Sequence, residues 1–253
     1  NYQKNKMPLL GLIGNPLSHS RSPELFGEIF RRESLKNWNY NLFPLSNIKL
    51  LPELIAAHPE LCGFNVTIPY KTDIIPFLDQ ISIEAEEIGA VNTVRIERNK
   101  NNITLIGYNT DAYGFEELLK FACAENAERA LVLGSGGAAK AVCYVLEKFN
   151  IPYSIASRNP LKGHILYGNL DEKIIKTHNL IINTTPLGMH PNIDECPPIP
   201  FDFISQNHTI IDLVYNPENT SLMKKVTNLG GKAFNGMLML QKQAEKAWEI
   251  FNK

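Results

Sequence analysis

The sequence predicts an α/β protein with two domains, and three observations lead to this fold class. The chain has 253 residues, of which 44% are hydrophobic, so it can form one large domain or two ordinary ones. Strand-like and helix-like patterns alternate over roughly the first 110 residues. A second series begins at Asp111 and includes a strand, a glycine-rich turn, a long apolar helix and another strand. That series is typical of a βαβ unit in a parallel sheet.

In the first region, short apolar or alternating runs predict strands at residues 9–13, 39–43, 63–68, 91–97 and 104–108. Helical patterns follow residue 22, cover 50–57, and occur in pieces between 72 and 88, ending at Gly89. At the first helix, Ser22 is expected to be the N-cap and Pro23 the first helical residue. In the strand at 63–68, the alternating Phe64, Val66 and Ile68 are expected in the core.

In the second region, strands are expected at residues 130–133, 153–156, 180–182 and 210–214. Helices are expected after Asp111, after the glycine-rich turn as far as about residue 149, and at 237–251. The apolar stripe of the last helix is flanked on opposite edges by Gln241 and Gln243. Periodicity does not decide which of these two glutamines faces a binding site.

The composition argues against several function classes. A net charge of −1 gives no general attraction to nucleic acid or to an anionic membrane. The four cysteines are far apart and form no metal-ligand pattern, which predicts neither a disulfide framework nor a metal site. No apolar run reaches the roughly 18 residues of a membrane span, and the first residues have no signal-peptide pattern. A cytoplasmic protein is therefore expected.

A glycine-rich turn follows the strand at 130–133 and reads Gly134-Ser135-Gly136-Gly137-Ala138-Ala139. The first glycine of such a turn allows the tight bend, and the second lets the backbone approach a pyrophosphate. The following helix offers unpaired N–H groups and the positive end of its dipole. An ordinary strand-to-helix turn is the alternative, because glycines are common in turns.

The end of the next strand indicates which dinucleotide is bound. An acidic residue there would bind the ribose hydroxyls of NAD, whereas this chain has Ser157, Arg158 and Asn159. An arginine can bind a 2′-phosphate through paired hydrogen bonds. We therefore predict NADP as the cofactor, with Arg158 binding the phosphate and Lys162 available to add charge.

Four polar stretches lie outside the dinucleotide-binding pattern, each at a predicted strand end: HSRSP, NVTIPYK, AVNTV and NTDAYG. Ligands of open α/β sheets bind outside the carboxyl ends of strands, so these stretches can converge on one pocket. Single residues within them have simpler interpretations. Lys71 alone reads as a surface lysine, and Ser22 or Asp111 could each serve only as a helix cap.

Taken together, the motifs resemble the shikimate dehydrogenase family, which reduces 3-dehydroshikimate with NADPH. The resemblance spans nearly the whole chain, and its motifs are GNPLSHSRSP (14–23), NVTIPYK (65–71), AVNT (90–93), NTD (109–111), GSGGAAKA (134–141), SR (157–158), NTTPLGM (183–189), DLVYNP (212–217) and GMLMLQKQA (236–244). Their order and spacing make the match specific, and it implies a role in aromatic amino acid biosynthesis.

The resemblance also implies residue roles. Lys71 and Asp111 match the catalytic lysine and aspartate of the family. The implied substrate-binding residues are Ser20, Ser22, Thr67, Asn92, Tyr215 and Gln243. The implied cofactor-binding residues are Gly134, Gly136, Gly137, Ala138, Arg158, Leu213 and Gly236. An ammonium beside a carboxylate stays charged and can give a proton to a reduced ketone, but the base for the reverse direction stays open. His19 is another acid–base candidate, although the family pattern uses the serines near it.

The implied architecture has a substrate-binding domain at 1–110, completed by the helix at 236–253, and a Rossmann-like NADP-binding domain at 111–235. The active site is expected in the cleft between them. The partner is a small-molecule substrate, and the protein is expected to be a monomer or a homodimer. Where the family commonly has Asn-Arg-Thr or Asn-Arg-Ser, this chain has Ser157-Arg158-Asn159, so the strictness of NADP use stays open. The alternatives are a quinate/shikimate dehydrogenase with relaxed cofactor use and a catalytically silent NADP-binding sensor.

Overall fold

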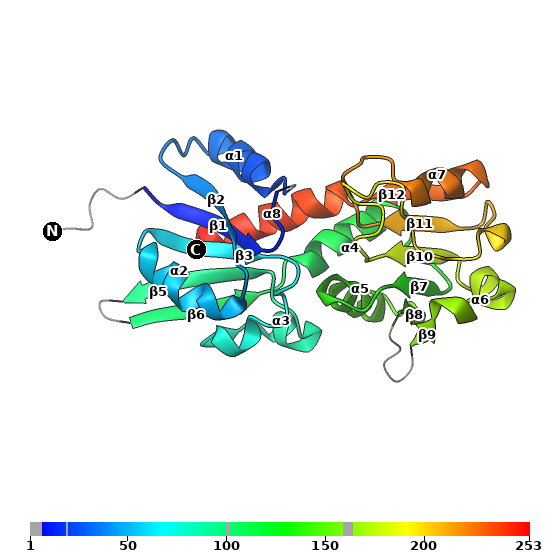
Figure 1. Ribbon diagram of the computed structural model, residues 1–253, viewed down its shortest axis with the longest axis horizontal. Helices are drawn as coiled ribbons and strands as arrows, with labels where there is room; N and C mark the ends of the chain where they lie inside the picture. The colour runs from blue at the N-terminus through cyan, green and yellow to red at the C-terminus, as the bar shows by residue number, and fades with distance from the viewer. Residues whose placement is uncertain (1–6, 19, 100–101, 159–163) are drawn as a thin grey trace. The chain divides into compact units, whose positions relative to one another are not determined.

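A computed structural model describes residues 7–18, 20–99, 102–158 and 164–253. Its α-carbon contacts divide the chain into two compact units (Figure 1). Unit 1 contains the described residues up to Thr110 together with Gln243–Lys253, and unit 2 is Asp111–Lys242. The predicted residues His19, Asn159 and Lys162 lie outside the described residues. None of the helices in the described ranges is both long and apolar enough to cross a membrane.

Unit 1 contains a mixed six-stranded sheet in the order β2-β1-β3-β5-β6-β4. Its strands are β1 (Leu9–Gly14), β2 (Asn39–Pro44), β3 (Leu61–Val66), β4 (Gln80–Ile81), β5 (Thr93–Asn99) and β6 (Asn102–Tyr108). The β1, β2 and β3 strands are parallel, whereas β5 runs antiparallel to both β3 and β6. The α-helices are α1 (Ser22–Arg32), α2 (Leu51–Ala57) and α3 (Ile83–Ile88), and α8 (Met237–Phe251) contributes its part from Gln243.

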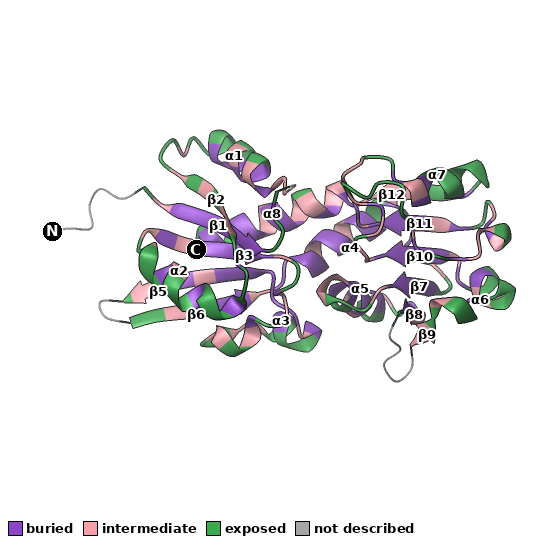
Figure 2. Cartoon of the chain, in the orientation of Figure 1, coloured by how far each residue is buried: buried purple, intermediate pink, exposed green. Residues whose placement is uncertain are grey.

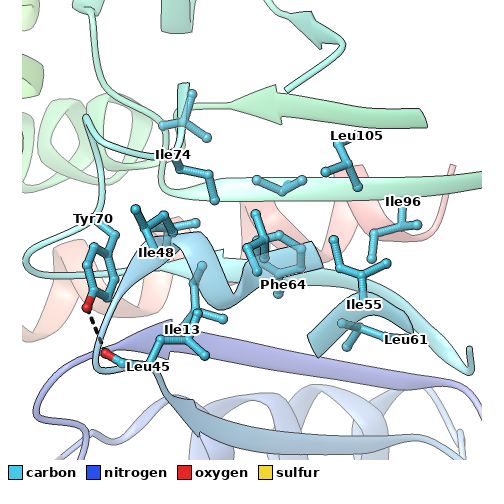
Figure 3. Packing of buried hydrophobic residues seen from close by; sticks show 14 of the residues in the cluster. Ile13, Leu45, Ile48, Ile55, Leu61, Phe64, Tyr70, Ile74, Ile96 and Leu105 are labelled. Atoms are coloured by element: carbon cyan, nitrogen blue, oxygen red, sulfur yellow. Dashed lines mark hydrogen bonds between the residues drawn. The ribbon is translucent and has the colours of Figure 1, made fainter. Parts of the chain in front are cut away.

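The core of unit 1 lies between this sheet and the segments of residues 45–57 and 70–91 (Figure 3). Its central side chains are fully buried, among them Ile13, Leu51, Leu61, Phe64 and Ile74. Burying a large aliphatic or aromatic side chain stabilises the folded state by about 1.5–3 kcal/mol. The helices of the unit expose their other faces to solvent (Figure 2).

Unit 2 contains a six-stranded sheet in which every neighbouring pair is parallel. Its strands are β7 (Ala130–Leu133), β8 (Tyr153–Ser157), β9 (Ile165–Leu166), β10 (Leu180–Asn183), β11 (Thr209–Asp212) and β12 (Lys232–Asn235). The order across the sheet is β9-β8-β7-β10-β11-β12. Counted from β7, this is 3-2-1-4-5-6, the order of a Rossmann fold. The predicted fold class is confirmed.

The α-helices of unit 2 are α4 (Asp111–Phe121), α5 (Gly137–Lys148), α6 (Glu172–Thr177), α7 (Ser221–Asn228) and the first part of α8. The central strands β7 and β10 are buried along their whole length (Figure 2). In a sheet of this order, the strand sequence changes direction between β7 and β10. The loops after these two strands therefore flank the position at which Rossmann folds bind dinucleotides.

Two predictions about the strand at residues 63–68 are wrong. The β3 strand ends at Val66, two residues before its predicted end, and Ile68 is 54% exposed instead of lying in the core. Beyond Val66 the backbone forms a turn in which the Tyr70 N–H donates to the Thr67 carbonyl, so strand alternation no longer sets side-chain direction. The segment between residues 72 and 88 also contains the short strand β4, which pairs with β6, in addition to its helical pieces.

Candidate active site

Within unit 1, the loops after β1 and β3 approach each other closely. A Cβ atom added to Gly14 would lie 2.5 Å from the Thr67 Cγ2 atom and 2.9 Å from the Ile68 carbonyl oxygen. The Asn15 N–H donates to that same carbonyl at 3.0 Å, and the Thr67 N–H donates to the Ile13 carbonyl. Because glycine has no side chain, the chain after β1 can lie against the predicted substrate residue Thr67.

Lys71 follows this turn, and its backbone is held on both sides. The neighbouring Tyr70 is buried, and its hydroxyl donates to the Leu45 carbonyl at 2.7 Å (Figure 3). The Lys71 carbonyl accepts from the Val91 N–H at 2.7 Å, which brings the lysine backbone next to the segment carrying Asn92. Lys71 itself is half-buried, so the interpretation as an ordinary surface lysine does not describe its surroundings.

Asn92, Thr110 and Gln243 form a buried polar cluster in unit 1. Gln243 is 9% exposed, and its Oε1 atom lies 3.3 Å from the Thr110 Oγ1 and 3.5 Å from the Asn92 Nδ2. The Asn92 Oδ1 accepts from the Thr110 N–H at 2.7 Å, and the Asn92 Nδ2 donates to the Thr110 Oγ1 at 3.0 Å. Gln241, in contrast, is exposed, so the two glutamines that periodicity could not separate differ in burial.

Ser20 and Ser22 lie together at the start of α1. The Ser22 N–H donates to the Ser20 Oγ, and the Ser20 hydroxyl donates to the Ser22 Oγ, both at 3.2 Å. The prediction that Ser22 caps this helix is wrong. Arg21 occupies the N-cap position without a side-chain capping bond, and Ser22 is the first helical residue. The Ser22 hydroxyl therefore accepts from Ser20 instead of capping the helix.

In unit 2, the glycine-rich turn has the geometry expected for a pyrophosphate site. Gly134 has a φ of +108°, and an added Cβ atom would lie 2.7 Å from the Thr184 Oγ1 in the loop after β10. Gly136 precedes α5 without a side-chain capping bond, and an added Cβ atom there would meet nothing within 4 Å. The backbone at Gly136, Gly137 and Ala138 therefore leaves space for an anion beside the N–H groups of the first helical turn. These residues fit a bound dinucleotide.

Arg158 directly follows β8 and is exposed, with Ser157 rather than an acid before it. The positive charge of Arg158 lowers the pKa of Tyr167. Burial of the tyrosine raises that pKa by more, so the net shift is upward. The guanidinium of this arginine has the charge that binding a 2′-phosphate requires, and its role there stays a prediction.

Leu213 and Gly236 are in direct contact within unit 2. A Cβ atom on Gly236 would lie 2.1 Å from the Leu213 carbonyl oxygen, and the Gly236 N–H donates to the Val214 carbonyl at 3.2 Å. Tyr215 follows on the same loop after β11 and is half-buried. Asp111 is the first residue of α4 and is 5% exposed.

The loop carrying Leu213 depends on the buried carboxylate of Asp212. This carboxylate accepts from the Asn183 Nδ2, the Val214 N–H and the Thr220 hydroxyl, at 2.9, 3.1 and 2.6 Å. Burial raises the pKa of Asp212, and these three hydrogen bonds oppose that shift. The Thr220 Oγ1 in turn caps α7 by accepting from the Met223 N–H.

The predictions missed several residues that support the site. Thr110 is fully buried between Asn92 and Gln243, and the NTD motif contained it, but only the aspartate of that motif was assigned a role. Thr93 and Asn65 are also buried and hydrogen-bond to each other and to Asn92. The sequence alone does not show that polar residues at these strand ends are buried.

Comparison with known proteins identifies the family. The model of the shikimate dehydrogenase substrate binding domain matches residues 12–94. The shikimate dehydrogenase (NADP(+)) of Methanococcus maripaludis is 39% identical over 263 residues, which cover 97% of this chain and 91% of that protein. The chain belongs to the shikimate dehydrogenase family.

Solved structures of this family agree with the fold. The shikimate dehydrogenase from Aquifex aeolicus has a TM-score of 0.86 at 33% identity, covering 97% of this chain and 92% of that one. The shikimate 5-dehydrogenase from Thermus thermophilus, solved in complex with NADP(H) and shikimate, has a TM-score of 0.84 at 28% identity and covers 97% and 93% of the two chains. This chain is thus similar to a shikimate dehydrogenase family member that holds both ligands.

Proposed function

We propose that this protein catalyses the reversible, NADPH-dependent reduction of 3-dehydroshikimate to shikimate. The observation that carries the proposal is the full-length similarity to relatives named shikimate dehydrogenase (NADP(+)). The chemistry of the candidate residues agrees with it. One unit supplies buried amides and hydroxyls suited to a polyhydroxylated ring, and the other supplies a Rossmann turn followed by an arginine.

In this proposal the residues of unit 1 bind and orient the substrate. Asn92 and Gln243 bind its ring hydroxyls through amide groups that the buried cluster holds in place. The hydroxyls of Ser20 and Ser22 donate to its carboxylate, and the Thr67 hydroxyl contributes a further hydrogen bond. Hydroxyls and amides can bind alcohols and one carboxylate without the cationic groups that a phosphate requires.

The bound cofactor supplies the hydride. As the ketone is reduced, negative charge develops on its oxygen, and an ammonium group can stabilise that charge and provide the proton. We assign this role to Lys71, and we assign to Asp111 the carboxylate that favours the charged form of the lysine. Tyr215 is assigned to the substrate, and Leu213 and Gly236 to the nicotinamide end of the cofactor.

A spectrophotometric assay of the purified protein tests the proposal. NADPH formation should depend on shikimate and should be much faster with NADP than with NAD, and quinate should be a poor substrate. Comparable turnover of quinate, or equal use of both cofactors, would favour the quinate/shikimate dehydrogenase alternative. No shikimate-dependent formation of NADPH or NADH would contradict the proposal and favour the silent sensor.

The Arg158→Ala variant tests the basis of cofactor choice. Loss of a guanidinium that pairs with the 2′-phosphate should raise KM for NADPH by about tenfold or more. KM for NADH should change little, because NADH has no phosphate at that position. Equal weakening of both cofactors would show that Arg158 does not bind the 2′-phosphate.

We also propose that the reaction serves aromatic amino acid biosynthesis in the cytoplasm, with the protein acting as a monomer or a homodimer on a small-molecule substrate. The product named in the relatives supports the pathway, and the sequence has no pattern that predicts binding to nucleic acid. Sedimentation analysis of the purified protein would establish its oligomeric state.

A further inference from the structure

Four neighbouring strands of unit 2 end in register at the edge of the sheet next to the candidate cofactor residues. The strands β7, β10, β11 and β12 lie side by side (Figure 1). Their last residues are paired across the sheet, and in order they are Leu133, Asn183, Asp212 and Asn235. Three of these strands are followed at once by a candidate cofactor residue, namely Gly134, Leu213 and Gly236.

The three polar members of this row each direct the chain into the loop that follows. In each case the side-chain oxygen accepts a hydrogen bond from the N–H two residues later. These bonds measure 3.0 Å from Thr185 to Asn183, 3.1 Å from Val214 to Asp212 and 3.0 Å from Met237 to Asn235. The start of each loop is therefore fixed by a side chain that belongs to the sheet.

Asp212 is the member of the row that joins separate segments. Besides the Val214 N–H, its carboxylate accepts from the Asn183 Nδ2 on the neighbouring strand at 2.9 Å and from the Thr220 hydroxyl at 2.6 Å. Asp212, Asn183 and Thr220 are all 0% exposed. The three donors are neutral groups, so within the described part of the chain no ion pair offsets the burial of this carboxyl group. An apolar residue would avoid that cost, which indicates a role for the carboxylate in holding the loops.

The two strand ends that Asp212 connects lead to different parts of the candidate cofactor site. Asn183 is followed by Thr184, whose Oγ1 would lie 2.7 Å from a Cβ atom added to Gly134 of the glycine-rich turn. Asp212 is followed by Leu213, which we assign to the nicotinamide. The bond between Asn183 and Asp212 thus links the segment beside the pyrophosphate turn to the segment assigned to the nicotinamide.

We propose that Asp212 is a positioning residue that holds the loop of Leu213 where the nicotinamide of NADP binds. It acts through the Val214 backbone and through Asn183, because a fully buried carboxylate cannot itself contact the ligand. This inference rests on the proposed function, to which the assignment of Leu213 belongs. A displaced loop should weaken binding of the nicotinamide half of NADP. The adenosine half, assigned to the glycine-rich turn and Arg158, should bind as before.

Titration calorimetry with two ligands tests the inference. NADP contains both halves, whereas adenosine 2′,5′-bisphosphate lacks the nicotinamide half. Asp212→Asn keeps the shape of the side chain but replaces one acceptor oxygen by an N–H donor, so at least one of the three donors loses its acceptor. The Kd for NADP should rise by about threefold to tenfold, the usual effect of one hydrogen bond, while the Kd for the bisphosphate stays near the wild-type value.

Asp171→Asn is the matched control. It makes the same substitution in the same unit, at an exposed carboxylate that caps α6 by accepting from the Ile174 N–H at 2.8 Å. Asparagine caps a helix about as well as aspartate does, so both Kd values should match those of the wild type.

Thr220→Val gives an independent measurement, which also decides the matter if Asp212→Asn does not fold. It removes the hydroxyl that donates to Asp212, and the same selective weakening of NADP binding is expected. Thr220→Ser keeps a hydroxyl at this position and should bind both ligands as the wild type does.

The outcomes separate this inference from the proposed function. If the wild type binds NADP, and Asp212→Asn and Thr220→Val bind it equally well, the role of Asp212 alone is overturned. The same holds if these variants weaken both ligands alike, because a general loss of stability in unit 2 would have that effect. If the wild type does not bind NADP, the proposed function is overturned, and the inference with it.

Discussion

Two glutamines in α8 have very different surroundings although they are only two residues apart. Gln241 is exposed, whereas Gln243 is 9% exposed and faces the donors of Asn92 and Thr110. A buried donor that loses its acceptor costs about 1–3 kcal/mol, so Gln243 supports the cluster as well as any ligand bound to it. Its structural role in the cluster therefore accompanies the substrate-binding role that we propose for it.

The contrast between the two glutamines gives a matched prediction. Gln243→Ala should raise KM for shikimate by about tenfold or more, because it removes one proposed ligand group and an acceptor shared by two neighbouring donors. Gln241→Ala should leave KM and kcat close to the wild-type values. Steady-state kinetics with saturating NADP measures both, and a similar KM for the two variants would contradict the assignment of Gln243.

The backbone of Lys71 is held by the turn after β3 and by the bond from the Val91 N–H to its carbonyl. Lys71→Ala should therefore fold normally and bind NADPH with nearly unchanged affinity. Its kcat should fall by roughly 10²-fold or more, the usual contribution of a general acid. Turnover near that of the wild type would remove Lys71 from the mechanism, and fluorescence titration with NADPH serves as the control.

At the scale of secondary structure elements, the candidate site depends on segments that approach each other without a side chain between them. In unit 1, Gly14 at the end of β1 allows contact with Thr67, and in unit 2 Gly236 just before α8 allows contact with the Leu213 carbonyl. The positions of these loops are thus set by backbone contacts, which any Cβ atom would push apart.

Substitution at Gly236 should show this dependence. Gly236→Ala places a Cβ atom 2.1 Å from the Leu213 oxygen, and the backbone shift required should lower the free energy of unfolding by about 1–3 kcal/mol. Gly27→Ala in α1 is the control, because its Cβ atom would meet nothing within 4 Å. There, alanine should stabilise the helix by about 0.5–1 kcal/mol. Urea unfolding measures both effects, and a stable Gly236→Ala variant would contradict the contact.

At the scale of the whole molecule, the candidate residues of the two units differ in their chemical groups. The amides and hydroxyls at Ser20, Ser22, Thr67, Asn92 and Gln243 are in unit 1, and the glycine-rich turn and Arg158 are in unit 2. The assignment of one unit to the substrate and the other to the cofactor stays a prediction, because it concerns ligands rather than the fold.

Hydrogen exchange with single ligands tests that assignment. NADP alone should slow amide exchange at residues 136–139, where the first N–H groups of α5 have no acceptor within the helix. Shikimate alone should slow exchange around residues 20–22 and 90–93 of unit 1. Mass spectrometry of peptides would detect both effects, and protection of the α5 turn by shikimate alone would contradict the division.

The sequence predicted the elements best where local signals were strong. The β7 strand was placed correctly because a continuous apolar run ends at the bend of Gly134, and α8 was placed correctly because its stripe is regular. The β12 strand was missed, since four residues flanked by glycines carry no detectable alternation. The environments of Ile68, Ser22 and Thr110 could not be predicted, because they depend on contacts with residues far away in the chain.

The contribution of Gln243–Lys253 to unit 1 has a consequence for biosynthesis on the ribosome. Phe251 and Trp248 pack against Phe26 and Phe30 of α1, so the early part of unit 1 lacks these partners until residue 251 has been translated. By then the entire sequence of unit 2 has been translated. We therefore expect unit 2 to complete its fold first. Until residues 243–253 are available, unit 1 stays incomplete, and its unpaired apolar surface is accessible to chaperones.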